Sequence, residues 1–234
     1  MSIIASFPNS VWDGLTENRE IPGDIKNPDD RDWDRMTVEI RAMQQHLNVL
    51  FSGSDDNHIE LVEPVWDDLR LTASHVRVPA EQNPTWTAYK GAQVLAFADQ
   101  SVEVNEEIIY YLTQLPHRYL PGSLIVPHVH WVGEDTGAQD VVWQLTYSWA
   151  NHDDVFPAET TIVTPADTNS GNHQVTRFAP VDGTGMEWSS MIIGSLSRKS
   201  SAVEDTYAGK NAYLLELDFH YQVGQFGSHL ESDY

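Results

Sequence analysis

The stretch AYLLELDFHYQV, residues 212–223, alternates apolar and polar side chains along its whole length. Successive side chains of a β-strand point to opposite faces, so this alternation predicts a strand with one buried and one solvated face. The predicted buried face collects Tyr213, Leu215, Leu217, Phe219, Tyr221 and Val223. The predicted polar face collects Leu214, Glu216, Asp218, His220 and Gln222. Such a strand is typical of an antiparallel sandwich.

Short runs of the same kind, separated by turn residues, fill the chain from about residue 59 onward. They cover residues 65–78, 85–98 with a turn at Lys90 and Gly91, 106–116, 123–133, 140–151, 160–164, 173–179 and 186–198. In the run 140–151, one face holds Trp143, Leu145, Tyr147 and Trp149. About eight such strands predict a mainly β protein, a jelly-roll-like antiparallel β-sandwich over residues 59–234. Residues 52–57, SGSDDN, have the composition of a linker.

The composition excludes several classes of protein. The net charge of −22, from 35 acidic and 13 basic residues, repels nucleic acid and anionic membrane surfaces. The chain has no cysteine, which rules out disulfides and thiolate metal sites. No apolar run approaches the roughly 20 residues that span a bilayer. The first residues lack the basic and apolar pattern of a secretory signal, so no signal peptide is expected and the chain is expected to be made in a cytoplasm.

Residues 28–53 carry the pattern of one helix, helical over 28–51. Asn27 can cap it, Pro28 suits its first position, and Gly53 lies just past its end. Apolar residues recur with heptad spacing at Trp33, Met36, Ile40, Met43, Leu47 and Leu50. An amphipathic helix lying on its own β domain has this pattern, and so does a self-associating coiled coil. The narrow seam favours an oligomerising coiled coil.

Residues 1–27 have no sustained period of 2 or 3.6 and are rich in Pro, Gly, Asn and Asp. A loose terminus has this composition, and so does an arm that becomes ordered on a neighbouring protein. Large apolar residues scattered through the polar segment favour a docking arm. Its main anchors are Phe7, Val11, Trp12 and Leu15.

The segment LPHRYLPGSLIVPHVHW, residues 115–131, holds His128 and His130 two positions apart on a predicted strand. The two side chains share a face, roughly 6–7 Å apart at their roots, and could clamp one divalent metal ion. Each ring would then need a second acceptor to fix its tautomer. Pro127 in the same strand indicates an edge or a bulge.

Three interpretations of this pair stay open. Gly122, His128, His130 and Glu134 resemble the first half of the cupin metal motif, although no second half follows, and this implies a metal-dependent enzyme. A metal shared on a symmetry axis is the second interpretation. The third is structural: the imidazoles bond to backbone or to carboxylates of a neighbouring strand, with Asp218 or Glu216 as candidates. The missing half-motif favours the structural interpretation.

The same segment resembles a recurrent segment of tailed-bacteriophage virion proteins, which reads Leu-Pro-His-x-Tyr, Gly-Ser, Pro-His-x-His-Trp and then a Trp-containing strand. The matching residues are Leu115, Pro116, His117, Tyr119, Gly122, Ser123, Pro127, His128, His130, Trp131 and Trp143. The resemblance implies a virion location and carries over no catalytic residue. By analogy with β-rich virion appendages, it also implies a homotrimer.

Other chemistry is weakly supported by the sequence. No Gly-rich phosphate loop and no Gly-x-Ser-x-Gly elbow occurs. Trp86, Trp188 and Tyr207 could stack on a host-surface saccharide.

We therefore expect a non-enzymatic, cofactor-free structural component of a tailed-phage virion, held to other virion proteins through its N-terminal arm. A head decoration or fibre and a tail fibre or adsorption protein both fit. The alternative is a cupin-like metalloenzyme that uses His128, His130 and Glu134.

Overall fold

The computed structural model describes residues 40, 42–43, 51–53 and 59–227. Among the predicted seam residues, Ile40 and Met43 are described; both are helical, and Met43 is 59% exposed. The other four seam residues and the docking-arm anchors lie outside the described residues. The predicted end of the helix is wrong, because Phe51–Gly53 forms strand β1, which pairs with Ile59–Leu61 in a hairpin.

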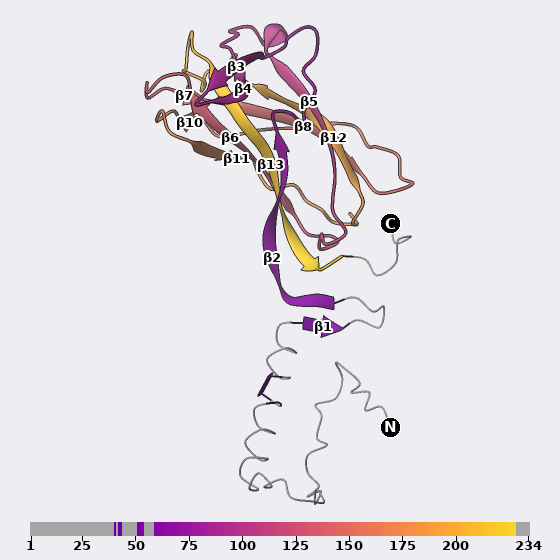
Figure 1. Ribbon diagram of the computed structural model, residues 1–234. Helices are drawn as coiled ribbons and strands as arrows, with labels where there is room; N and C mark the ends of the chain where they lie inside the picture. Colours follow the sequence, from indigo (N-terminus) through magenta and orange to yellow (C-terminus); the bar gives the residue numbers. More distant parts are fainter. Residues whose placement is uncertain (1–39, 41, 44–50, 54–58, 228–234) are drawn as a thin grey trace, which may run out of the picture.

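Two antiparallel sheets face each other (Figure 1). In the first sheet, β13 (Ala212–Gln225) pairs along one edge with β6 (Ile125–Gly133). Along its other edge it pairs first with β4 (Ala92–Phe97) and then with β2 (Ile59–Thr72). The other strands of this sheet are β1, β3 (Thr85–Tyr89) and β11 (Gln174–Arg177).

The second sheet has the order β5–β12–β8–β9. Its strands are β5 (Ile108–Gln114), β12 (Met191–Arg198), β8 (Trp143–Ala150) and β9 (Thr160–Val163). The smaller elements are the pair β7 (Asp140–Val141) and β10 (Asp167–Thr168) and the 3₁₀ turn η1 (Glu103–Asn105). Every range predicted as β contains a strand, so the antiparallel β-sandwich is confirmed. No helix in the described part of the chain is long and apolar enough to cross a membrane.

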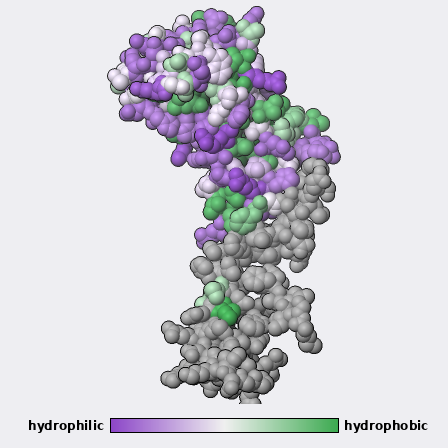
Figure 2. All heavy atoms as spheres, viewed as in Figure 1, coloured by the Kyte–Doolittle hydropathy of each residue, from purple (hydrophilic) through white to green (hydrophobic). Residues whose placement is uncertain are grey.

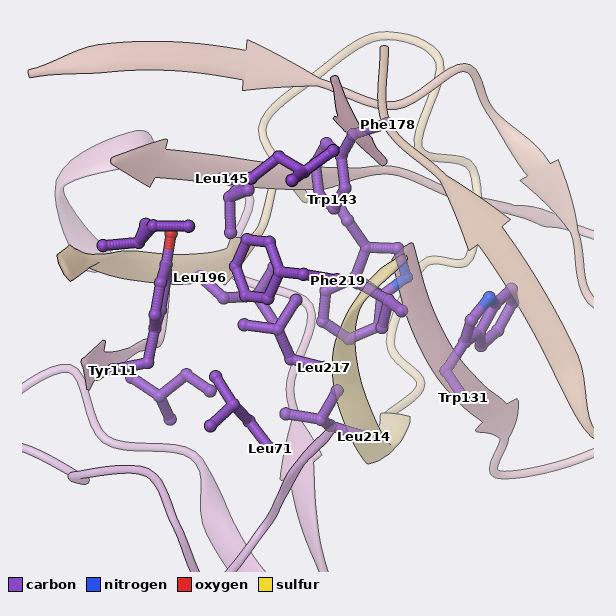
Figure 3. Packing of buried hydrophobic residues seen from close by; sticks show 14 of the residues in the cluster. Leu71, Tyr111, Trp131, Trp143, Leu145, Phe178, Leu196, Leu214, Leu217 and Phe219 are labelled. Carbon is purple, nitrogen blue, oxygen red and sulfur yellow. The ribbon is translucent and has the colours of Figure 1, made fainter. Parts of the chain in front are cut away.

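The core between the sheets is rich in aromatic residues (Figure 3). Trp143 of β8 meets the edge of Phe97 with ring centroids 5.3 Å apart, and lies 6.4 Å from Trp131 of β6. As predicted, Trp143, Leu145 and Trp149 are buried on one face of β8, and Tyr147 packs against the same core. Large flat side chains bury much apolar area for little lost side-chain entropy, which suits a sandwich without disulfides.

The alternation predicted for the last strand is wrong in its first part. β13 changes register between Leu214 and Glu216, so Leu215 is an extra residue of a β-bulge. Before the bulge the inward residues are Ala212 and Leu214, both 0% exposed, rather than Tyr213 and Leu215. After the bulge, Leu217, Phe219 and Tyr221 face the core as predicted. The bulge thus reverses which side of the strand faces inward.

A buried ion pair holds the loop that joins β12 to β13. Arg198 and Asp205, each with a side chain 1% exposed, contact through Nη2 and Oδ1 at 2.6 Å and through Nε and Oδ2 at 3.0 Å. The guanidinium also donates to the carbonyls of Tyr207 and Lys210. Tyr207 beneath it is 0% exposed, which corrects its assignment as a saccharide-stacking residue.

Replacing Arg198 with Met should lower the free energy of unfolding by about 3–5 kcal/mol, because the carboxyl group of Asp205 would be left buried without its partner. Urea unfolding followed by tryptophan fluorescence measures the change. The exposed Arg77 supplies the matched control. Arg77→Met should cost under about 0.5 kcal/mol. Equal losses in the two variants would contradict a stabilising role for the Arg198–Asp205 contact.

The hairpin between β3 and β4 turns at the predicted residues, Lys90 and Gly91. Both have positive φ, +49° and +85°, as a two-residue type I′ turn requires. A Cβ on Gly91 would meet nothing within 4 Å, so only backbone strain opposes a side chain there. Gly91→Ala should therefore destabilise the protein by about 1 kcal/mol, and Lys90→Asn should stabilise it slightly, because Asn tolerates positive φ. Thermal unfolding of both variants checks the opposite signs.

Candidate metal centre

The outward face of the first sheet carries rows of polar side chains that run across the strands. In one row, His128 of β6 lies directly opposite Asp218 of β13. In the next row, His130 lies opposite Glu216. A third row pairs His220 of β13 with Asp68 of β2. The strand order therefore gathers residues that are far apart in the chain.

His128, His130 and Asp218 converge on one point. The Nε2 atoms of the two rings are 3.1 Å apart. Oδ2 of Asp218 lies 3.6 Å from Nε2 of His128 and 3.4 Å from Nε2 of His130. His128 and Asp218 are 1% and 2% exposed, whereas the side chain of His130 is 22% exposed. These three residues form a group whose ligand atoms could hold a metal ion.

The remaining ring nitrogens face acceptors. Nδ1 of His130 lies 2.7 Å from Nε2 of His173, and Nδ1 of His128 lies 3.4 Å from the carbonyl oxygen of Val126. His173 stacks on His130 with ring centroids 4.9 Å apart. Each imidazole therefore turns one nitrogen toward Asp218 and the other toward a group that can accept its proton.

The electrostatics of the site keep Asp218 ionised. Burial raises the pKa of Asp218, but the hydrogen bonds and positive charge of His128 and His130 outweigh it and lower the pKa to about 2. Oδ1 of Asp218 and Oε1 of Glu216 are buried and have no hydrogen-bond partner. The other oxygen of Glu216 accepts a bond of 2.6 Å from Arg70. Buried carboxylate oxygens of this kind ordinarily have a partner.

A second group lies beside the first. Nε2 of His220 contacts Oδ1 of Asp68 at 2.6 Å, and the His220 and His128 rings have centroids 4.3 Å apart. Burial lowers the pKa of His220, and the nearby His128 lowers it further. Asp68, His128 and His220 together form the other set of residues in the described chain that could hold a metal ion.

The structure bears out part of the sequence prediction for this site. His128 and His130 share a face, and Asp218, one of the two carboxylates expected on a neighbouring strand, lies between them. Glu134, the third ligand of the cupin interpretation, lies elsewhere. Its Oε2 accepts bonds of 2.9 Å from the backbone and side-chain amides of Asn211. The cupin ligand set is therefore wrong, because β6 ends at Gly133 and Glu134 bonds to Asn211, the residue just before β13.

Pro127 lies in an internal strand, which corrects its expected place at an edge or bulge. Strand β6 has β13 on one side and β11 on the other. The carbonyl of Pro127 accepts from the amide of Phe178, the residue after β11 ends. In an antiparallel sheet the amide and the carbonyl of one residue point to the same neighbouring strand. Proline has no amide hydrogen, and at Pro127 that hydrogen would point toward β11 just beyond its last residue, Arg177, so no hydrogen bond within β11 is lost.

His173 and Asp68 were missed as parts of the site. His173 stands in a polar, turn-rich segment and Asp68 in an acidic pair, and neither local sequence indicates a metal site. His173 precedes β11, and only the pairing of β11 with β6 brings it to His130.

No protein-family model matches the chain, and no curated protein matches it either. Solved structures resemble it weakly. The CBM35 module of Abf62 from Cellvibrio japonicus is 11% identical, with 65% of this chain and 92% of that chain covered and a TM-score of 0.35. The CBM22-2 xylan-binding domain of Xyn10C from Paenibacillus barcinonensis is 12% identical, with 72% and 94% covered and a TM-score of 0.34.

The Cry4Aa toxin from Bacillus thuringiensis is 10% identical, with 68% of this chain and 23% of that chain covered and a TM-score of 0.38. The chain thus spans less than a quarter of the toxin. The CBM22-1–GH10 region of Xyn10B from Clostridium thermocellum is likewise matched over only 28% of its length, with 11% identity, 67% of this chain covered and a TM-score of 0.38. At these identities no ligand and no activity carries over to this protein.

Proposed function

We propose that this protein is a non-enzymatic structural component of a tailed-phage virion, with a jelly-roll-like sandwich displayed on an N-terminal attachment segment. The observation that supports it best is the way the first sheet leaves the sandwich. Strands β2 and β13, each 14 residues long, pair from Thr72 and Glu216 as far as Glu60 and Gln225. Their far ends, residues 60–66 of β2 and 222–225 of β13, form a two-stranded ribbon below the sandwich, next to the β1 hairpin (Figure 1).

The ribbon carries exposed apolar side chains. Val65 and Trp66 are 53% and 50% exposed, and Phe226, just after β13, is 66% exposed. Adjacent residues of a strand point to opposite faces, so neither face of β2 is covered here. Figure 2 shows hydrophobic atoms grouped where β2 and β13 leave the sandwich. Apolar groups of this kind mark contact surfaces.

The contact we propose for the ribbon is with further copies of the same chain, in a homotrimer. In the sequence the ribbon follows the segment whose heptad seam predicts self-association, with β1 between them, so we propose that both contribute to one interface. The N-terminal arm, with Phe7, Val11, Trp12 and Leu15 as anchors, would then attach the trimer to capsid or tail proteins.

The burial of the histidine site favours a structural role over catalysis. Two of its three converging residues, His128 and Asp218, are at most 2% exposed, so almost none of their surface is open to a substrate. The cupin-like alternative also lacks its third ligand, because Glu134 is bonded to Asn211.

If the protein is a tail fibre or adsorption protein, we propose that its distal surface binds a saccharide. Trp86, which is 47% exposed, is the residue best placed to stack on a sugar.

Mass spectrometry of purified phage particles tests the virion assignment. We expect the chain in stoichiometric amount in particles purified from lysates of infected cells. Immunogold labelling of the same particles separates head from tail placement. The chain's presence in the lysate and its absence from washed particles would refute the proposal.

The oligomer is tested on the full chain by multi-angle light scattering. Wild type should be a trimer, and the double variant Val65→Ser/Trp66→Ser should dissociate at a concentration roughly tenfold higher or more, since each lost apolar side chain removes about 1.5–3 kcal/mol of burial. Trp86→Ser, at an equally exposed tryptophan on another strand, is the control and should stay trimeric. A monomeric wild type at high concentration would overturn the trimer.

A further inference from the structure

We propose that His128, His130 and Asp218 bind one divalent transition-metal ion of the zinc type, which links β6 to β13. The ligand atoms are Nε2 of each histidine and Oδ2 of the aspartate. This inference concerns the sandwich itself and does not depend on the proposed virion role.

The spacing of the three atoms fits a tetrahedral ion. Their separations are 3.1, 3.4 and 3.6 Å. A tetrahedral ion with ligands at about 2.05 Å holds those ligands about 3.3 Å apart. The mean of the three separations is about 3.4 Å, so an ion would fit with shifts of a few tenths of an ångström. Two ligands come from one strand at positions i and i+2, and the third comes from the paired strand.

The protons of the two rings support the same assignment. A neutral imidazole carries one proton. If Nδ1 of His130 donates to His173 and Nδ1 of His128 donates to Val126, both Nε2 atoms are left with lone pairs. Those lone pairs face each other and the Asp218 carboxylate. In that tautomer a cation between the three atoms removes the repulsion among them, whereas with the protons on Nε2 the rings donate hydrogen bonds to Asp218 instead. The outer bonds of the two rings are those that commonly orient metal-bound histidines.

The donor set selects the class of metal. Two imidazoles suit Zn²⁺ and its neighbours in the first transition row, whereas Ca²⁺ and Mg²⁺ prefer oxygen ligands. His130, with a side chain 22% exposed, leaves one side of the site toward solvent, where a water molecule can supply the fourth ligand. The buried Oδ1 of Asp218, which has no hydrogen-bond partner, can bind the ion directly or accept a bond from that water.

The second group, Asp68 with His128 and His220, is the less suitable site. His220 is already bonded to Asp68 at 2.6 Å. Nε2 of His128 is directed at His130 and Asp218, so it cannot serve both groups. His220 is therefore a neighbour of the proposed ion and provides a control.

The role that follows is a cross-strand link. His128 and Asp218 are paired directly across β6 and β13, and β13 is the strand on which the first sheet is built. An ion bound to the folded state alone stabilises it by mass action, about 2.7 kcal/mol when its free concentration is a hundred times the Kd. The bound ion would also balance part of the buried negative charge of Asp218 and Glu216.

The test uses the full chain, stripped with a chelator and titrated with ZnCl₂ in a calorimeter. Wild type should bind one ion per chain tightly and unfold at a higher temperature with zinc than without. His130→Ala should lose this binding, and His173→Ala should weaken it roughly 10–100-fold, as expected for a residue that orients a ligand. His220→Ala and the exposed His152→Ala should bind as wild type does.

Two results would overturn the proposal. One is a stripped wild type that takes up no stoichiometric ion, in which case a shared proton holds the three groups together. The other is loss of binding in His220→Ala with binding kept in His130→Ala, which would assign the ion to the Asp68 group. If His130→Ala does not fold, Co²⁺ loading of wild type decides: intense visible absorption indicates a tetrahedral nitrogen and oxygen site, and its absence contradicts one.

Discussion

The pairing of β13 along both of its edges is the constraint on which the rest of the structure depends. The strand bonds to β6 on one side and to β4 and β2 on the other, so its register fixes three neighbours at once. Its inward face supplies Leu214, Leu217 and Phe219 to the core. Its outward face supplies Asp218 to the histidines. One strand therefore carries both the packing of the sandwich and the chemistry of its outer surface.

The bulge at Leu215 lets β13 bury both Leu214 and Leu217, which lie an odd number of residues apart. Without it, a strict alternation would place either Leu214 or Leu217 on the wrong face. The extra residue restores burial for both, and it leaves Glu216 opposite His130. A bulge also increases local twist, which helps β13 turn from the partner β4 to the partner β2.

The sequence predicted the strands well because alternation is a local signal. Trp143, Leu145 and Trp149 of the run 140–151 and Leu217, Phe219 and Tyr221 of the run 212–223 face the core as predicted. The Lys90–Gly91 turn forms where turn chemistry requires positive φ. The bulge was not predictable from the same signal, since Leu214 and Leu215 are both leucine and either could face inward. The jelly-roll order, the N-terminal arm and the helix stay predictions.

Only part of the candidate site could be predicted from the sequence. The histidines sit two residues apart, so their shared face follows from the strand alone. Asp218 lies 90 positions away. The polar face of the last strand made Asp218 and Glu216 candidate partners, but the choice between them depends on the register of β13 against β6, which a single sequence does not specify. Glu134 was wrong for the opposite reason: it is close in sequence, but its chain segment has left the strand. Local patterns thus found the histidine strand and a candidate partner strand, and could not set the register between them.

The ribbon formed by β2 and β13 has a mechanical consequence. A pull on the sandwich through residue 59 acts along the axis of β2, parallel to the strands. The hydrogen bonds to β13 would then be loaded together, in shear, rather than opened one after another as in a peeled hairpin. A sandwich loaded in this way should therefore resist extension better than one whose two strands are peeled apart.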